Sequence, residues 1–228
     1  MIYVTGDTHG QIDFFKLVVF AEKNRRLTKQ DYVIIAGDFG AIWDTKTLQK
    51  NLDRYSKLPW TTLFVDGNHE NFDMINSYPV ETWNGGKVHK IREDIIHLMR
   101  GQVFEIEGKK IFTFGGATSI DRGMRILGTS WWKEEEPTVF DMDEAEKNLE
   151  AHDRTVDYVI THSCSEKMLY RLPLFERPEK LNVRIDNAFL TNFERTVNFK
   201  WWYFGHYHVD KEIPPSHRAL YQDFVLLE

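Results

Sequence analysis

The sequence has few of the features that mark secreted, membrane-spanning or nucleic-acid-coating proteins. Only one of its 228 residues is a cysteine, Cys164, so no disulfide can form within the chain and a reducing compartment is expected. No apolar run approaches the roughly 20 residues that a transmembrane helix needs, so we expect no contact with a membrane. The first apolar run begins at residue 2, which leaves no room for a secretory leader. These absences predict a cytoplasmic protein.

Excess positive charge is also missing. The formal net charge is −6, and no stripe of lysine and arginine is present, which disfavours a partner such as nucleic acid without excluding a local basic groove. What the chain does have is enough apolar sequence, 42 % of its residues, to bury a substantial core. It contains no linker and no low-complexity tract, so we expect a single domain over residues 1–228.

The first third of the chain repeats one pattern. A short apolar run is followed by a glycine-flanked polar loop and then by a stretch with helical periodicity. The apolar runs cover 2–4, 32–36 and 61–65, and the helical stretches cover 11–26 and 47–57. Because this pattern recurs about every 30 residues, it is typical of βα units and predicts an α/β fold with a parallel sheet.

From about residue 85 the pattern favours short antiparallel strands, with a hairpin turn at Glu107-Gly108. Further expected strands cover 95–98, 102–106, 109–114, 157–160 and 200–204, with one or two edge strands in the tail at 219–221 and 224–227. Helices are expected over 141–151, capped by Asp141, and over 185–197. Two long irregular segments, 115–137 and 164–179, are predicted to shape a substrate cleft.

Polar side chains follow five of the predicted strands at the point where each strand ends. These side chains are Asp7, His9, Asp38, Asn68, His69, His162, His206 and His208. Five of the nine histidines fall in this set, a concentration that random placement does not produce. Open α/β sheets present reactive groups at the C-terminal ends of their strands. Imidazole, carboxylate and amide oxygen together suit Mn, Fe, Zn or Ni better than Mg or Ca, so the pattern predicts a metal site.

The five motifs together resemble those of the calcineurin-like metallophosphoesterase superfamily, in order and in spacing. The motifs are Gly-Asp-Thr-His at 6–9, Gly-Asp at 37–38, Gly-Asn-His-Glu at 67–70, Thr-His at 161–162 and Gly-His-Tyr-His at 205–208. The resemblance implies a four-layer α/β/β/α sandwich of two mixed β-sheets flanked by helices. The stretch 115–121, followed by Trp131-Trp132, looks like a small bacterial and phage-type branch of the superfamily.

The resemblance also implies a site for two divalent metal ions, with manganese as the first choice and Fe, Zn or Ni as alternatives. The first ion would be held by Asp7, His9, Asp38 and His208. The second would be held by Asp38, Asn68, His162 and His206, so that Asp38 bridges the two. A solvent-derived hydroxide between the ions would attack the phosphorus atom.

Other residues near the motifs carry weaker predictions. The resemblance implies that His69 is the general acid toward the leaving group, or a proton relay, against the alternative of a structural residue. Glu70 is interpreted either as a structural residue or as a hydrogen-bonding partner of the ligands, and Asp66 as a hydrogen-bonding partner of a metal-binding histidine. Arg122 and Arg125 are interpreted either as a clamp for the substrate phosphate or as solvated loop charges.

The leading hypothesis is therefore a dinuclear metal-dependent phosphoesterase that acts on a small phosphomonoester or phosphodiester. A Ser/Thr protein phosphatase is disfavoured, because residues 39–42 and Asp66 stand where that group carries phosphate-binding arginines. A nuclease is the second enzymatic alternative. The alternative outside enzymes is a scaffold on the same fold, which would be expected to lose ligands that this chain retains.

Overall fold

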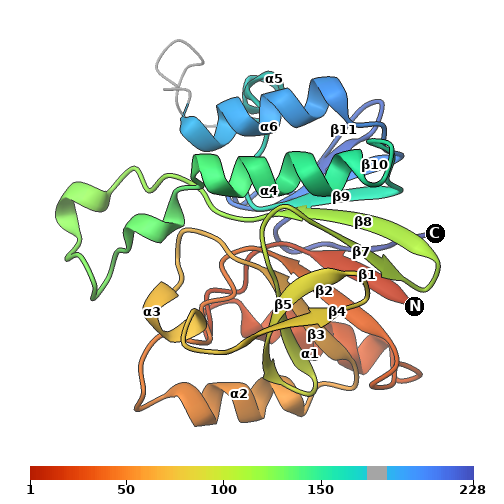
Figure 1. The fold of residues 1–228 in the computed structure, drawn as a ribbon. Helices are drawn as coiled ribbons and strands as arrows, with labels where there is room; N and C mark the ends of the chain where they lie inside the picture. The colour runs from red at the N-terminus through yellow and green to blue at the C-terminus, as the bar shows by residue number, and fades with distance from the viewer. Residues whose placement is uncertain (174–183) are drawn as a thin grey trace.

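The computed structural model describes residues 1–173 and 184–228 (Figure 1). The helices are α1 (Phe14–Lys23), α2 (Leu48–Ser56), α3 (Phe72–Ile75), α4 (Val139–Glu150), α5 (Glu166–Leu169) and α6 (Ile185–Thr196). The strands are β1 (Ile2–Thr5), β2 (Tyr32–Ala36), β3 (Thr61–Val65), β4 (Val80–Trp83), β5 (Gly86–Arg92), β6 (Ile95–Leu98), β7 (Gln102–Ile106), β8 (Lys109–Phe114), β9 (Tyr158–Thr161), β10 (Trp201–Phe204), β11 (Lys211–Ile213), β12 (His217–Ala219) and β13 (Phe224–Leu226).

These strands form two mixed sheets. The first has seven strands in the order β13-β1-β2-β3-β6-β5-β4, and the second has six in the order β11-β12-β10-β9-β8-β7. Strands β1, β2, β3 and β6 run parallel in the first sheet, as β8, β9, β10 and β12 do in the second. Antiparallel partners flank both parallel groups. The central parallel strands β2, β3, β9 and β10 are mostly apolar and almost entirely buried, because both of their faces are covered.

Three apolar cores separate four layers. The central core lies between the two sheets and includes Ile34 of β2 and Ile160 of β9. A second core, with Leu17 of α1, packs helices α1 and α2 against the outer face of the first sheet. The third core, with Leu149 and Phe193, packs α4 and α6 against the outer face of the second sheet, at the top of Figure 1. The predicted α/β/β/α sandwich of two mixed sheets flanked by helices is confirmed.

Most predicted elements are present within a few residues of their expected positions. Strands β4, β5 and β11 and the short helices α3 and α5 were not anticipated. In the tail, β13 is an edge strand as expected, but β12 lies inside the second sheet between β11 and β10. The segment 115–137 holds only two 3-10 turns, Arg122–Met124 and Lys133–Glu135. Of the segment 164–179, residues 174–179 lie outside the described residues.

The start of α4 corrects one prediction. Asp141 does not cap this helix, because the capping residue is Thr138, whose side-chain oxygen accepts a hydrogen bond from the Asp141 amide at 3.4 Å. The Asp141 carboxylate accepts in return from the Thr138 amide at 2.7 Å. This reciprocal pair is a capping box, which places the acidic residue three positions inside the helix rather than at its cap.

No helix among the described residues is long and apolar enough to cross a lipid bilayer.

Candidate metal centre

The predicted ligands lie just beyond the C-terminal ends of parallel strands from both sheets. Asp7, Asp38 and Asn68 follow β1, β2 and β3 of the first sheet, and His162 and His206 follow β9 and β10 of the second. His162 Nδ1 donates a hydrogen bond of 2.9 Å to the carbonyl of Ala36, the last residue of β2. The loops of the two sheets therefore meet at one edge of the sandwich, where open α/β sheets bind their ligands.

Four of these side chains form a close cluster. Potential ligand atoms of Asp7, His9, Asp38 and His208 all lie within 4.8 Å of one another. His208 Nε2 lies 3.1 Å from Asp7 Oδ2, and His9 Nε2 lies 3.3 Å from Asp38 Oδ2. Among the described residues, Asp7 Oδ2 is buried and accepts no hydrogen bond. Since an unpartnered buried carboxylate oxygen is costly, this oxygen among imidazole nitrogens fits a divalent cation.

A second group shares Asp38 with the first. His162 Nε2 lies 3.3 Å from Asp38 Oδ1 and 3.1 Å from Asn68 Oδ1. The His206 ring lies beside that of His162, with 4.9 Å between ring centroids. The structure thus brings together all seven residues that the sequence predicted as ligands, in two groups that meet at Asp38. The two oxygens of Asp38 face different groups, as a bridging carboxylate requires.

Hydrogen bonds from outside the two groups fix the orientation of these side chains. His9 Nδ1 donates to Asp13 Oδ2 at 2.8 Å, which leaves Nε2 free to bind a metal. The Asn68 amide nitrogen donates to Ser119 Oγ at 3.0 Å, so its oxygen is turned toward His162. Ser119 Oγ in turn donates to the buried carboxylate of Glu135 at 2.8 Å.

The backbone at the site is held in an unusual conformation. His9, Asp38, His206 and His208 have φ angles of 43°, 47°, 68° and 51°, in the left-handed region that non-glycine residues rarely adopt. Such conformations persist where surrounding contacts enforce them, and they concentrate at functional sites. Gly37 explains the Gly-Asp motif, because a Cβ atom there would lie 1.9 Å from His162 Nδ1.

Burial and neighbouring charges shift the pKa values of the histidines in opposite directions. Burial by itself lowers the pKa of His9, but the Asp38 and Asp13 carboxylates outweigh it and raise that pKa to about 9. Burial is likewise outweighed at His162, whose pKa the Asp38 carboxylate raises to about 10. Burial, together with the charge of His162, lowers the pKa of His206 to about 4. The site thus concentrates negative charge that attracts cations, protons or metal ions alike.

His69 lies at the edge of the cluster. Its backbone amide donates to Asp38 Oδ1 at 2.7 Å, and its ring lies 5.5 Å from the His9 ring, centroid to centroid. Arg125 Nη2 donates to His69 Nε2 at 3.2 Å and also pairs with Asp121 at 2.9 Å. Burial lowers the pKa of His69, an effect that Asp38 opposes and Arg125 reinforces. The ring is therefore neutral at pH 7 in the arrangement described here.

The remaining predicted residues have separate positions. Arg122 pairs with Glu136 at 2.7 Å, and its side chain is 48 % exposed, against 14 % for Arg125. Glu70 supports the loop after β2, because its carboxylate accepts from the amides of Phe39 and Gly40 at 2.6 and 3.1 Å. Burial and the nearby Asp38 charge raise its pKa well above the ordinary value.

Asp66 corrects the expectation that it supports a ligand histidine. Among the described residues its carboxylate pairs with Arg100, whose Nε donates at 2.8 Å, and with His97, whose Nε2 donates at 3.1 Å. Neither partner belongs to the metal centre. The charge of Arg100 and the bond from His97 outweigh burial and hold the pKa of Asp66 well below its usual range.

Sequence reasoning missed several residues that surround the ligands. Asp13 stands four residues after His9, a spacing that places two side chains of a helical turn together and could have indicated the pair. Ser119 and Glu135 carry no comparable signal, because Ser119 reaches Asn68 from a distant loop and Glu135 supports Ser119. Tyr221, from the tail, stacks on His208 and is connected to His9 through Asp13. Only the fold brings these residues to the site.

The four-layer sandwich and its cluster of carboxylates and imidazoles at strand ends define a metallophosphoesterase. The chain belongs to the calcineurin-like phosphoesterase family, whose model matches residues 1–210. It is accordingly a phosphoesterase-type hydrolase, of a family that uses divalent metal ions.

Among solved structures, the chain is similar to a phosphopantetheinyl hydrolase from Mycobacterium tuberculosis, with 16% identity and a TM-score of 0.47 over 96% of this chain and 87% of that chain. It is also similar to the protein AQ665 from Aquifex aeolicus, described as of unknown function, with 14% identity and a TM-score of 0.39 over 87% of each chain. Neither likeness bears on the substrate of this chain. No curated protein matches the chain significantly.

Proposed function

We propose that the chain is a single-domain, dinuclear metal-dependent phosphoesterase that hydrolyses a small phosphomonoester or phosphodiester. The observation that carries this proposal is that six side chains with nitrogen or oxygen donors, from loops of both sheets, gather around the carboxylate of Asp38. The proposed ligands of the first ion are Asp7, His9, Asp38 and His208. Those of the second are Asp38, Asn68, His162 and His206. Manganese is the first choice of metal, with Fe, Zn or Ni as alternatives, because the donors are imidazole, carboxylate and amide.

Two ions bound there would neutralise charge on the phosphate oxygens and lower the pKa of a water molecule between them, which becomes the nucleophile. The residues of the chain hold this arrangement ready. Asp13 and the Ala36 carbonyl accept hydrogen bonds from Nδ1 of His9 and His162, so that both Nε2 atoms face inward, where a metal ion would displace any proton that they carry. Asn68 presents its oxygen because Ser119 accepts from its nitrogen.

His69 is proposed as the general acid that protonates the leaving oxygen. In the arrangement described here its Nε2 accepts from Arg125, so that atom carries no proton. A substrate phosphate would compete for the Arg125 guanidinium, since arginine binds phosphate more strongly than it binds a neutral imidazole. Release of Arg125 toward the phosphate would free His69 Nε2 to take up the proton that it later donates.

Hydrolysis of p-nitrophenyl phosphate and bis-p-nitrophenyl phosphate tests the proposal. We expect turnover of at least one substrate with added Mn²⁺ and none after chelation, and we expect Asp38→Asn to lose activity. No turnover of either substrate with Mn, Fe, Zn or Ni would contradict the enzyme and leave the scaffold alternative. The ratio of the two rates distinguishes a monoesterase from a diesterase, and digests of DNA and RNA test for a nuclease.

The two predicted arginines can be compared in the same assay. Arg125→Ala is expected to raise KM for the phosphate substrate by about tenfold, the order of one charge-assisted contact. The prediction that Arg122 also binds phosphate can be tested by Arg122→Ala. Its pairing with Glu136 on an exposed part of the loop leads us to expect a smaller effect.

A further inference from the structure

The C-terminal tail returns to the metal centre at Tyr221. Three consecutive amides, those of Tyr221, Gln222 and Asp223, donate to the carboxylate of Asp210 at 2.8 to 3.0 Å. Lys16 is buried beside them, and its ammonium group donates to the carbonyls of Tyr221 and, at 2.7 Å, Asp7. The backbone of Tyr221 is thus fixed against the loop that carries Asp7.

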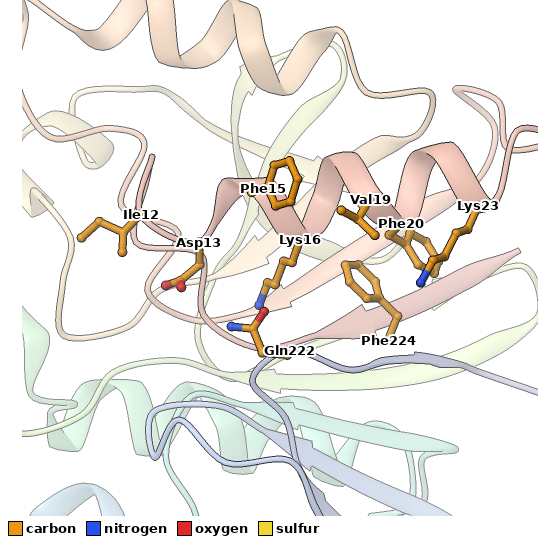
Figure 2. A pocket seen from close by; sticks show the side chains of 9 residues that line it. All are labelled: Ile12, Asp13, Phe15, Lys16, Val19, Phe20, Lys23, Gln222 and Phe224. Atoms are coloured by element: carbon orange, nitrogen blue, oxygen red, sulfur yellow. The ribbon is translucent and has the colours of Figure 1, made fainter.

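Figure 2 shows the same junction from close by. Lys16 extends from α1 toward Gln222, and Phe224 lies alongside the helix. An open groove of about 390 Å³ remains between α1 and this part of the tail. Phe224 anchors the tail by stacking on Phe20 of α1, with 3.9 Å between ring centroids, and the polar contacts of residues 221–223 hold the tail near the metal centre.

The side chain of Tyr221 is connected to two of the proposed ligands of the first ion, to His208 directly and to His9 through Asp13. Its hydroxyl donates to Asp13 Oδ1 at 2.9 Å, and Asp13 Oδ2 accepts from His9 Nδ1 at 2.8 Å. Its ring stacks on His208, with 4.7 Å between centroids and 15° between ring planes. One side chain from outside the matched family region therefore stacks on one histidine of the first group and shares a hydrogen-bond partner, Asp13, with the other.

We propose that Tyr221 is a positioning residue for the first metal ion, which orients His9 through Asp13 and His208 by stacking. This inference rests on the ligand assignment proposed above. His208 needs such support because its side chain is 49 % exposed and would otherwise sample several rotamers. Asp13 needs the Tyr221 hydroxyl because, without it, Oδ1 of this partly buried carboxylate would lose its hydrogen bond.

The hydrogen-bond geometry of Tyr221 agrees with this role. Its hydroxyl lies 2.9 Å from Asp13 Oδ1, and since a carboxylate oxygen accepts, the hydroxyl is the donor. The phenol thus satisfies one oxygen of Asp13 and leaves the other to hold the proton of His9 Nδ1. Outer hydrogen-bond partners of this kind typically contribute about 10–100-fold to metal affinity.

Two substitutions separate the two contacts. Tyr221→Phe keeps the ring on His208 and removes the hydroxyl, whereas Tyr221→Leu removes both. Equilibrium dialysis against Mn²⁺, with metal analysis of the protein, gives the dissociation constants of the two sites without any activity assay. We expect one of the two constants to rise about tenfold in Tyr221→Phe and about 100-fold in Tyr221→Leu, while the other constant stays unchanged.

Tyr158→Phe is the matched control. The Tyr158 hydroxyl donates to the backbone carbonyl of Glu228, so it also joins the tail to the body of the protein, but away from the metal centre. We expect this variant to bind both ions as the wild type does. Equal weakening in Tyr158→Phe would reduce Tyr221 to a general anchor of the tail and would overturn the proposal.

Two double variants test whether Tyr221 acts through Asp13 and whether it affects the first ion rather than the second. Once Asp13→Asn has removed the charge that holds His9, adding Tyr221→Phe should weaken metal binding by less than twofold more. In His208→Ala, which leaves only the second site competent, Tyr221→Phe should not change the affinity of the remaining ion. A tenfold effect in either background would overturn the proposal.

The outcomes also separate this inference from the proposed function. If the wild-type chain binds two Mn²⁺ ions and Tyr221→Phe binds both equally well, the role of Tyr221 is refuted and the two-metal site stands. If the wild-type chain cannot hold two ions with Mn, Fe, Zn or Ni, the ligand assignment fails and the role of Tyr221 fails with it.

Discussion

At the scale of single residues, the proposed ligand histidines differ from His69 in what their ring nitrogens contact. In His9 and His162, Nδ1 donates a hydrogen bond to an oxygen of the protein, so Nε2 is the nitrogen available to a cation. His69 is different, because its Nε2 accepts from Arg125, and it contacts the ligand set through its backbone amide. The same residue type thus serves two purposes according to what its other nitrogen contacts.

His69→Ala tests this difference. We expect the variant to bind both metal ions with wild-type affinity, because the backbone amide that contacts Asp38 is retained. Turnover should fall by about 10²–10⁴-fold for alkyl phosphates, whose leaving groups need a proton, and by much less for p-nitrophenyl phosphate. Steady-state kinetics and metal analysis measure the two effects. Loss of an ion would show instead that His69 is a ligand, and unchanged turnover of alkyl phosphates would refute the acid role.

At the scale of elements, the junction before α4 joins the irregular 115–137 segment to the second helical layer. Thr138 is the capping residue there, and substitution by alanine removes the side-chain oxygen that accepts from the Asp141 amide. We expect Thr138→Ala to lower the free energy of unfolding by about 1 kcal/mol, and Thr138→Ser to be close to neutral. Urea denaturation measures both values. Equal stability of Thr138→Ala and the wild type would show that this capping box contributes nothing.

Strands β5 and β6 carry a buried histidine pair that predicts a pH dependence of stability. His89 lies opposite His97 in the sheet, their Nδ1 atoms are 3.0 Å apart, and His97 Nε2 donates to Asp66. Burial, reinforced by the His97 ring, lowers the pKa of His89 from 6.5 to about 4. The folded protein therefore excludes a proton that the unfolded chain accepts between these two values.

The sign of the effect follows from that difference. Above pH 6.5 His89 is neutral in both states and adds no pH dependence. As the pH falls from 6.5 to 4, only the unfolded state gains the proton, so the free energy of unfolding should fall by about 1.4 kcal/mol per pH unit. Urea denaturation at several pH values should show a shallower decline for His89→Gln. His152→Gln, at the end of α4, is the control and should follow the wild type; an unchanged slope in His89→Gln would contradict the prediction.

At the scale of the whole molecule, more of the architecture than of the surroundings of the site could be predicted from the sequence. The buried parallel strands could be predicted because they are apolar runs in the sequence. The proposed ligands could be located because they directly follow those runs. Asp66 was assigned the wrong partner. Its position two residues before Asn68 does not determine which way its side chain points, and the side chain accepts from Arg100 and His97 instead.

Residues that approach from distant segments could not be predicted in the same way. Ser119 and Tyr221 carry no local pattern that points to a metal, and each reaches the site only after the loop or the tail has docked. The edge strands β4 and β11, and β5 beside β4, were missed because polar and aromatic residues interrupt their alternation, so that pairing with a neighbour decides their conformation. Sequence periodicity indicates which residues of a single helix or strand are buried. The site depends instead on contacts between side chains from different elements.

The metal centre lies where the loops of the two sheets meet, so metal binding should stabilise the whole sandwich. Asp7, Asp38 and Asn68 come from the first sheet, and His162 and His206 come from the second. An ion bound only by the folded state contributes about 2.7 kcal/mol at 100 times its Kd, and each kcal/mol raises Tm by about 2–4 °C in a chain of this size. We expect Mn²⁺ to raise Tm by several degrees in calorimetry, a chelator to reverse the rise, and Asp38→Asn to abolish most of it because this carboxylate is proposed to serve both ions. A Tm that does not respond to any of the four candidate metals would mean that the folded chain does not bind them in preference to the unfolded chain, and would contradict the proposed metal centre.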